Sequence, residues 1–162
     1  GLILNTLPTL KGKKIVSPFF GGGSVELCLA QNLGFEVIGY DIFDILTNFW
    51  DILINHKDEF IKELKKFKIN PEEFTYNRHV LLNYWEKVKP KDLNYKTKNK
   101  INLEEVDKTL LDNNKILQAC YYYYNMSLSY GPMFLGWPSA NEINVEKFKR
   151  RINILYIIVL LI

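Results

Sequence analysis

The chain has 162 residues, a formal net charge of +3 and a pI near 8.7, with 48% hydrophobic and 24% charged residues. This length suits a single domain over residues 1–162, and the composition is ordinary for a soluble globular protein. The charge permits nucleic-acid binding without arguing for it, and the two cysteines, Cys28 and Cys120, form neither a metal-binding spacing nor a disulfide framework. We therefore expect a cytoplasmic protein without metal ligands.

The first informative stretch is a short strand followed by glycines. Ile15 and Val16 predict a buried, β-branched strand that Pro18 ends, and three glycines follow at 21–23. Glycines permit positive φ and let a ligand lie against the backbone. Ser24 is expected to be the N-cap of the next helix, whose N-terminus offers unpaired N–H groups and a positive dipole end. The pattern predicts a ligand-binding turn between a strand and a helix.

A second strand and an acidic residue complete this unit. Gly34 ends the helix, residues 35–40 form an apolar run, and Asp41 follows the glycines at the distance where nucleotide-binding folds place a ribose-binding carboxylate. Glu26 stands where a dinucleotide fingerprint has its third glycine, and no lysine follows the glycines as it would in a phosphate-binding P-loop. A ribose-bearing cofactor without a phosphate, S-adenosylmethionine (SAM), fits these residues.

Residues 18–24 read Pro-Phe-Phe-Gly-Gly-Gly-Ser. They resemble the P-F-x-G-x-G-S cofactor loop of the adenine-specific DNA methyltransferases of the Dam type (D12 class), and Asp41 resembles the ribose-binding acid of that family. The resemblance implies an α/β fold: a Rossmann-like, SAM-dependent methyltransferase domain with a helical insertion over residues 70–140 that recognises double-stranded DNA. The alternative is a Rossmann-like turn that binds another ligand or none.

The resemblance also implies which residues contact the cofactor. Gly21 and Gly23 would let the loop wrap the methionine moiety, with Phe19 beside it. Asp41 would hold the ribose, and Ile42 would border the adenine ring. The implied cofactor-binding residues are Pro18, Phe19, Phe20, Gly21, Gly22, Gly23, Ser24, Asp41 and Ile42.

Apolar periodicity predicts helices in the middle of the chain. Repeats at three and four residues over 45–54 and 57–67 indicate amphipathic helices. Asn70 can cap a following segment in which Pro71 fits the first helical turn, and a helix is expected around residues 80–88.

The end of the chain predicts one more helix and then a strand. Residues 142–151 predict a helix with Val145, Phe148 and Ile152 facing inward. The apolar run at 152–162 is far shorter than the roughly 20 residues that span a bilayer, so no membrane segment is expected. Its β-branched content predicts a buried strand.

Six lysines and no arginine lie between residues 87 and 100, interleaved with one tyrosine. Lysines in such a loop can contact DNA phosphates, where they release counterions and supply sequence-independent affinity. Lys96 and Lys98 are the candidate contacts. The alternative is a solvated loop without a ligand.

A second candidate DNA contact lies within residues 116–138, which begin as an apolar helix and break into a loop rich in Gly, Pro and aromatic residues. Asn125 matches the resembled family, whereas Met126 replaces an arginine of its pattern and puts that contact in doubt. Alternatively, the four consecutive tyrosines here pack between helix and sheet with their hydroxyls reaching the surface. The candidate contacts are Tyr124, Asn125 and Ser127.

The catalytic tetrapeptide of the resembled family, Asp-Pro-Pro-Tyr, is absent, because no two prolines of the chain are adjacent. In the family it accepts hydrogen bonds from the adenine amine and stacks on the flipped base. We assign no catalytic residue, and Glu26 and Asp44 near the loop are interpreted as structural. We expect a chain truncated before that motif, carrying the cofactor-binding part of a site-specific DNA adenine methyltransferase. A second polypeptide would then supply the motif.

Two alternatives remain open. One is an inactive SAM- or DNA-binding remnant. The other is an unrelated Rossmann nucleotide-binding enzyme, such as a dehydrogenase.

Overall fold

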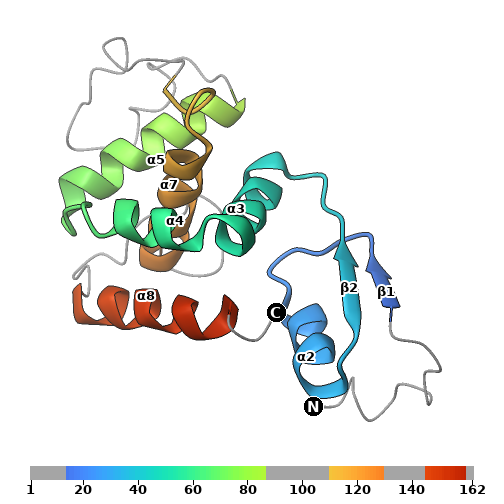
Figure 1. Ribbon diagram of the computed structural model, residues 1–162. Helices are drawn as coiled ribbons and strands as arrows, with labels where there is room; N and C mark the ends of the chain where they lie inside the picture. Colours follow the sequence, from blue (N-terminus) through green and yellow to red (C-terminus); the bar gives the residue numbers. More distant parts are fainter. Residues whose placement is uncertain (1–13, 87–109, 130–144, 160–162) are drawn as a thin grey trace.

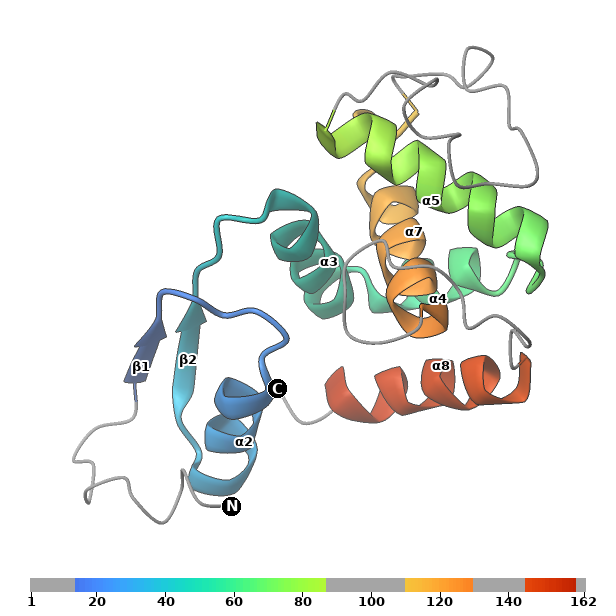
Figure 2. The same cartoon turned by 180° about the vertical axis from the view of Figure 1, so that it is seen from behind.

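The computed structural model describes residues 14–86, 110–129 and 145–159, and its elements fall into two parts. The first, here called the strand unit, consists of β1 (Lys14–Ser17), α2 (Ser24–Leu33) and β2 (Glu36–Gly39). The second, here called the helical part, consists of α3 (Asp44–Asn55), α4 (Lys57–Leu64), α5 (Pro71–Glu86), α7 (Lys115–Leu128) and α8 (Val145–Val159). Figures 1 and 2 show the strand unit on one side of the molecule and the helical part on the other, with α8 along the lower edge of the helical part.

The two strands are parallel and in register from the pair Lys14–Glu36 to the pair Ser17–Gly39. α2 connects them and packs against β2, so one face of the sheet is covered. The other face carries Val16, which is 59% exposed. The prediction of a strand was confirmed, but the prediction that it is buried was wrong within the described residues, because they supply no layer over this second face.

Glycines bound helix α2 at both ends. Gly23 is its N-cap, with a left-handed φ of 66° and no side-chain cap, so the prediction that Ser24 caps the helix was wrong. Ser24 is instead the first helical residue. Gly34 ends the helix as predicted, with φ at 67° and its N–H donating to the carbonyl of Ala30 at 3.0 Å.

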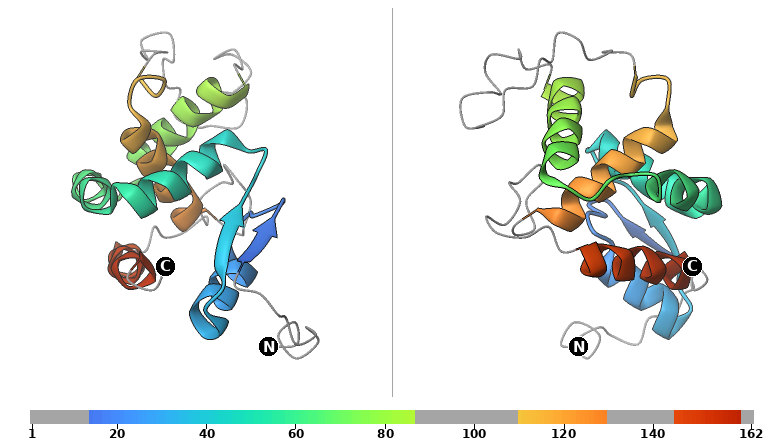
Figure 3. Two further views of the ribbon diagram at one scale, coloured as in Figure 1. Left: turned by 45° about the vertical axis from the view of Figure 1, so that its right-hand side comes forward. Right: turned by 90° about the vertical axis from the view of Figure 1, so that its left-hand side faces the viewer.

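The core of the protein lies in the helical part and is built around α7. This helix packs against α3, α4, α5 and α8, which surround it in Figure 3. The predicted amphipathic helices are confirmed as α3 and α4, since their apolar stripes are buried against it. The fully buried side chains include Ile45, Leu53, Phe60, Ile61, Leu64, Phe74, Leu81, Tyr124 and Phe148.

Helix α5 begins as the sequence predicts but runs longer than expected. Asn70 caps it, because its side-chain oxygen accepts from the N–H of Glu73 at 2.7 Å, and Pro71 is its first residue. From there one helix continues to Glu86, where the sequence predicted a separate helix from about residue 80.

Helix α8 overturns the prediction of a terminal strand. Residues 145–159 are helical throughout. Phe148, Ile152 and Leu155 are buried, and their spacing of four and three residues places them on one helical face, so the helical period outweighs the β-branched content. Val145 is exposed, which corrects its predicted inward position.

Candidate functional site

The glycine turn is held by hydrogen bonds from both sides. The N–H of Gly23 donates to the carbonyl of Phe20 at 2.9 Å, which closes the turn. The N–H of Phe20 donates to the carbonyl of Tyr40 at 2.8 Å, so the turn starts where the two strands end. Gly21 has φ at 53°, a conformation that favours glycine, and a Cβ at Gly21 or Gly22 would meet no atom within 4 Å. The outer side of the turn is therefore open.

Asp41 faces this turn across the ends of the strands. One carboxylate oxygen accepts from the N–H of Gly21 at 2.9 Å, and the other accepts from the N–H of Phe43 at 3.0 Å. These bonds, first that from Phe43 and then that from Gly21, hold the pKa of Asp41 below its ordinary value. The carboxylate therefore stays ionised, and with about four lone-pair sites it can accept further hydrogen bonds from hydroxyl groups.

Phe20 lies on the inner side of the turn. A Cβ on Gly39 would lie 2.3 Å from its ring, and one on Gly23 would lie 2.8 Å from it. The ring also meets Trp50 of α3 edge-on, with 5.1 Å between centroids. The backbone can pass this closely over the ring only because both positions are glycine. Phe20 thus packs beneath the turn and also lines the cavity beside it, and its predicted cofactor contact stays a prediction.

A cavity of about 280 Å³ opens beside the turn, between α2, β2 and α3. Its walls combine apolar side chains with three carboxylates, those of Glu26, Asp41 and Asp51. Glu26, in the first turn of α2, accepts a hydrogen bond from the hydroxyl of Ser17 at 2.6 Å. A carboxylate here occupies the helix end that would otherwise attract a phosphate, so the site disfavours a pyrophosphate ligand.

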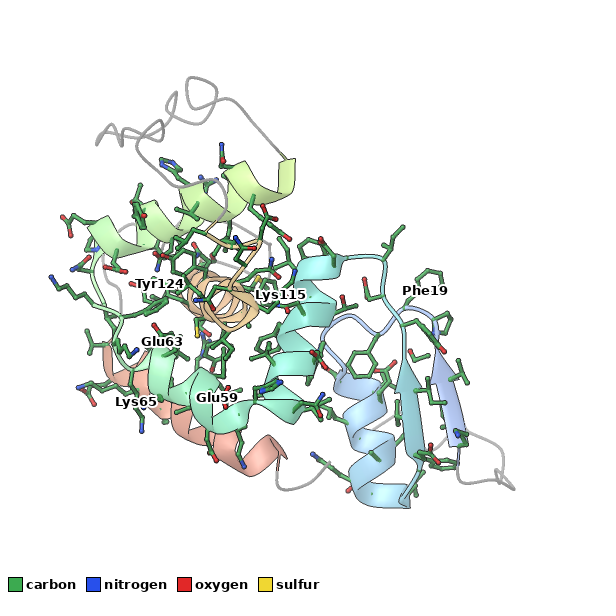
Figure 4. All side chains as sticks on the ribbon, turned by 45° about the horizontal axis from the view of Figure 1, so that its top comes forward. Phe19, Glu59, Glu63, Lys65, Lys115 and Tyr124 are labelled. Carbon is green, nitrogen blue, oxygen red and sulfur yellow. The ribbon has the colours of Figure 1, made fainter. Side chains whose placement is uncertain are left out.

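Two apolar side chains next to the turn and Asp41 are exposed. Phe19 is 86% exposed, and Ile42 is 99% exposed. Figure 4 shows Phe19 at the end of the strands, pointing away from the helices. Pro18, Gly22 and Ser24 are exposed as well, and Gly21, Phe20 and Asp41 are half-buried. Of the predicted cofactor residues, Gly23 is the buried one.

Tyr124 and Asn125, predicted as DNA contacts, are buried, and this corrects their interpretation. The hydroxyl of Tyr124 donates to the carbonyl of Lys68 at 2.9 Å, and its ring lies 5.3 Å from that of Phe148. Asn125 donates to the carbonyl of Tyr121 at 2.9 Å. Figure 4 places Tyr124 among the helices. Tyr124 therefore packs in the interior, among helices, and Asn125 lies beside it in α7, which continues to Leu128. The predicted loop rich in Gly and Pro lies mostly outside the described residues.

The structure does not test the other three predicted DNA contacts, which are Ser127, Lys96 and Lys98. Ser127 is half-buried near the end of α7, and its carbonyl accepts from Arg151 of α8. Lys96 and Lys98 lie outside the described residues. Their roles stay predictions.

Trp50 contacts the glycine turn and Tyr122 is buried in the core, and the sequence singled out neither of them for the site. The indole N–H of Trp50 donates to the carbonyl of Gly21 at 3.0 Å. Burial, and then the negative charge of Asp41, raises the pKa of Tyr122 to about 12, which places Tyr122 within electrostatic reach of that carboxylate. Their apolar helical positions predicted only core packing, because a contact over 29 residues leaves no local pattern.

In the described ranges, no group of three or more His, Cys, Asp and Glu side chains is placed to hold a metal ion. The same ranges contain no helix that is long and apolar enough to cross a membrane.

The chain combines helices with a small parallel sheet, and a carboxylate faces its open glycine turn. This arrangement is compatible with a methyltransferase fold. The family model described as D12 class N6 adenine-specific DNA methyltransferase matches residues 1–157. The chain therefore belongs to this family, whose substrate is adenine in DNA. Comparisons with curated proteins and with solved structures gave no match.

Proposed function

We propose that this chain binds SAM through the glycine turn and Asp41, and that it carries the cofactor-binding part of a Rossmann-like DNA adenine methyltransferase. SAM supplies an electrophilic methyl group when it is bound. The observation that carries the proposal is the 2.9 Å hydrogen bond from Gly21 to Asp41, which brings the turn and the acid together at the ends of parallel strands.

The residues present fit SAM better than a dinucleotide. The open side of Gly21 and Gly22 leaves room for a methionine moiety against the backbone. The ionised Asp41 can accept from ribose hydroxyls, and the exposed side chain of Ile42 can cover an adenine ring. Glu26 at the start of α2 opposes a pyrophosphate.

The chain contributes binding and orientation rather than the methyl-transfer step itself. Holding two reactants in line is a large part of the acceleration in such reactions. The groups that would accept hydrogen bonds from the adenine amine in this family, Asp-Pro-Pro-Tyr, are not among residues 1–162. We propose that they come from outside these residues, for example from a second polypeptide.

Calorimetric titration with SAM and with NAD tests the cofactor assignment. We expect SAM to bind and NAD not to bind. Asp41→Asn removes the charge that the two backbone N–H groups and the ribose require, so we expect affinity for SAM to fall at least about tenfold. Asp112→Asn, at an exposed carboxylate of the helical part, is the matched control. Equal SAM affinity in Asp41→Asn and wild type, or binding of NAD alone, would refute the assignment.

Transfer of a labelled methyl group from SAM to duplex DNA tests the division of roles. We expect no transfer by the chain alone and transfer when a separate polypeptide that carries an Asp-Pro-Pro-Tyr motif of this family is added. Transfer by residues 1–162 alone would show that the catalytic groups lie within this chain.

A further inference from the structure

One side chain of the helical part reaches into the glycine turn of the strand unit. Trp50, in α3, donates its indole N–H to the carbonyl of Gly21 at 3.0 Å. The N–H of the same glycine donates to Asp41 at 2.9 Å. Both polar groups of Gly21 are therefore bound by side chains from outside the turn, and the peptide planes on either side of it are oriented.

The same tryptophan also fixes the ring beneath the turn. Phe20 is enclosed by Gly23, Gly39 and Trp50, with its ring perpendicular to the indole at 88°. A Cβ on Gly23 would lie 3.0 Å from the indole as well. The turn thus packs over two aromatic rings, that of Phe20 from the turn itself and that of Trp50 from α3.

We infer that Trp50 is a positioning residue for the cofactor turn, which it holds in its binding conformation through the carbonyl of Gly21 and the ring of Phe20. This inference rests on the proposed function. A turn ordered before the ligand arrives loses less conformational freedom on binding, so the contact raises affinity without touching SAM itself. α3 is anchored in the core through α7, which gives the turn a rigid support.

Trp50→Phe tests this role, because phenylalanine keeps an aromatic ring and removes the N–H donor. Asn48→Ala is the matched control. Asn48 also lies on α3 and donates one side-chain hydrogen bond to a backbone carbonyl, that of Lys115 at 2.9 Å, within the helical part. Each variant loses one hydrogen bond from a side chain of α3 to a backbone carbonyl. Only the bond from Trp50 has its acceptor in the glycine turn.

The first measurement is amide hydrogen exchange in the ligand-free protein. The N–H groups of Gly21 and Gly23 are hydrogen-bonded and exchange slowly while the turn is closed. We expect Trp50→Phe to speed their exchange about three- to tenfold, and to leave the amide of Gln118, bonded to Asn114 in the helical part, unchanged. Asn48→Ala should leave Gly21 and Gly23 unchanged.

The second measurement is the affinity for SAM, which we expect to fall about three- to tenfold in Trp50→Phe and not in Asn48→Ala. Wild-type exchange at Gly21 and Gly23 in Trp50→Phe would overturn the inference. Absence of SAM binding in the wild type would refute the proposed function instead, and the exchange result would still decide the role of Trp50.

A second variant covers the case in which Trp50→Phe does not fold. Trp85→Phe and Trp137→Phe leave Trp50 as the single tryptophan of the chain, which can then be replaced during expression by benzothienylalanine. This analogue has the shape of tryptophan with sulfur in place of the N–H. The same increase in exchange is expected, and its absence would equally overturn the inference.

Discussion

The two parts of the molecule differ in how they are held together. In the helical part, rings and aliphatic side chains from five helices are buried around α7. Among residues 14–41, all of them described, Leu29 is the one hydrophobic side chain that is buried, at 5% exposure. The turn depends instead on individual hydrogen bonds with Asp41 and Trp50. Stability therefore resides mainly in one part and the proposed ligand binding in the other, which gives substitutions in the two parts different expected effects.

The largest expected effect is a loss of stability from the helical core. Phe60 is fully buried, with the rings of Phe49 and Tyr123 each at 6.0 Å. Phe60→Ala should lower the free energy of unfolding by about 3–5 kcal/mol, because it leaves a cavity that packed helices cannot fill. Phe19→Ala, at an exposed ring of the strand unit, should stay within about 0.5 kcal/mol of wild type. Urea denaturation measures both, and equal losses would erase the contrast between the parts.

The next effect is a pH dependence that His79 gives the helical part between about pH 6.5 and 4. His79 is fully buried, and neither ring nitrogen has a hydrogen-bond partner within the described part of the chain. Burial, and then the positive charge of Arg78, lowers its pKa to about 4 from an ordinary 6.5. The unfolded chain then binds the proton more readily, so the stability is complete above about pH 6.5 and falls by roughly 3 kcal/mol as the pH drops to about 4.

Denaturation at a series of pH values checks this prediction in two variants. His79→Leu should flatten the fall in stability between about pH 6.5 and 4. His56→Gln, at the exposed second histidine, should keep it. A wild-type stability that is independent of pH over this range would contradict the assignment.

Much of the strand unit could be predicted from the sequence, because its residue pattern is contained in one short stretch. Strand, glycines and acid follow one another within residues 14–41, and Gly34 ends α2 as predicted. Asp41 lies at the glycine turn, while its ribose-binding role stays a prediction. The errors arose where two local signals competed: residues 152–159 are β-branched and also helically periodic, and packing on α4 and α7 selects the helix. The burial of Tyr124 and the reach of Trp50 depend on contacts across 56 and 29 residues, which no local pattern encodes.

A smaller stability effect with a large binding effect is expected at the border of the two parts. Gly39→Ala would place a Cβ 2.3 Å from the ring of Phe20, and Gly39 is not among the glycines with positive φ, so the cost comes from the ring and not from the backbone. We expect a loss of about 1–3 kcal/mol in stability and at least tenfold in affinity for SAM.

The double variant Gly39→Ala with Phe20→Leu provides the control. The smaller leucine side chain should relieve the clash with the new Cβ, so part of the lost stability and part of the lost SAM affinity should return. Gly21→Ala is strained by its φ of 53° and meets no atom within 4 Å, so Phe20→Leu should bring it no relief. Equal rescue of the two variants, measured by thermal unfolding and SAM titration, would contradict the enclosed position of Phe20.

The smallest expected effect concerns the uncovered face of the sheet. Lys14 and Glu36 pair across β1 and β2 at 3.0 Å, with side chains 56% and 65% exposed, on the same face as Val16. An ion pair in water contributes little, so Lys14→Ala should cost less than about 1 kcal/mol and the loss should shrink further in high salt. A loss well above that value, insensitive to salt, would mean that this face is covered in solution. The strand unit would then possess a second buried layer, and the contrast in packing between the two parts would have to be redrawn.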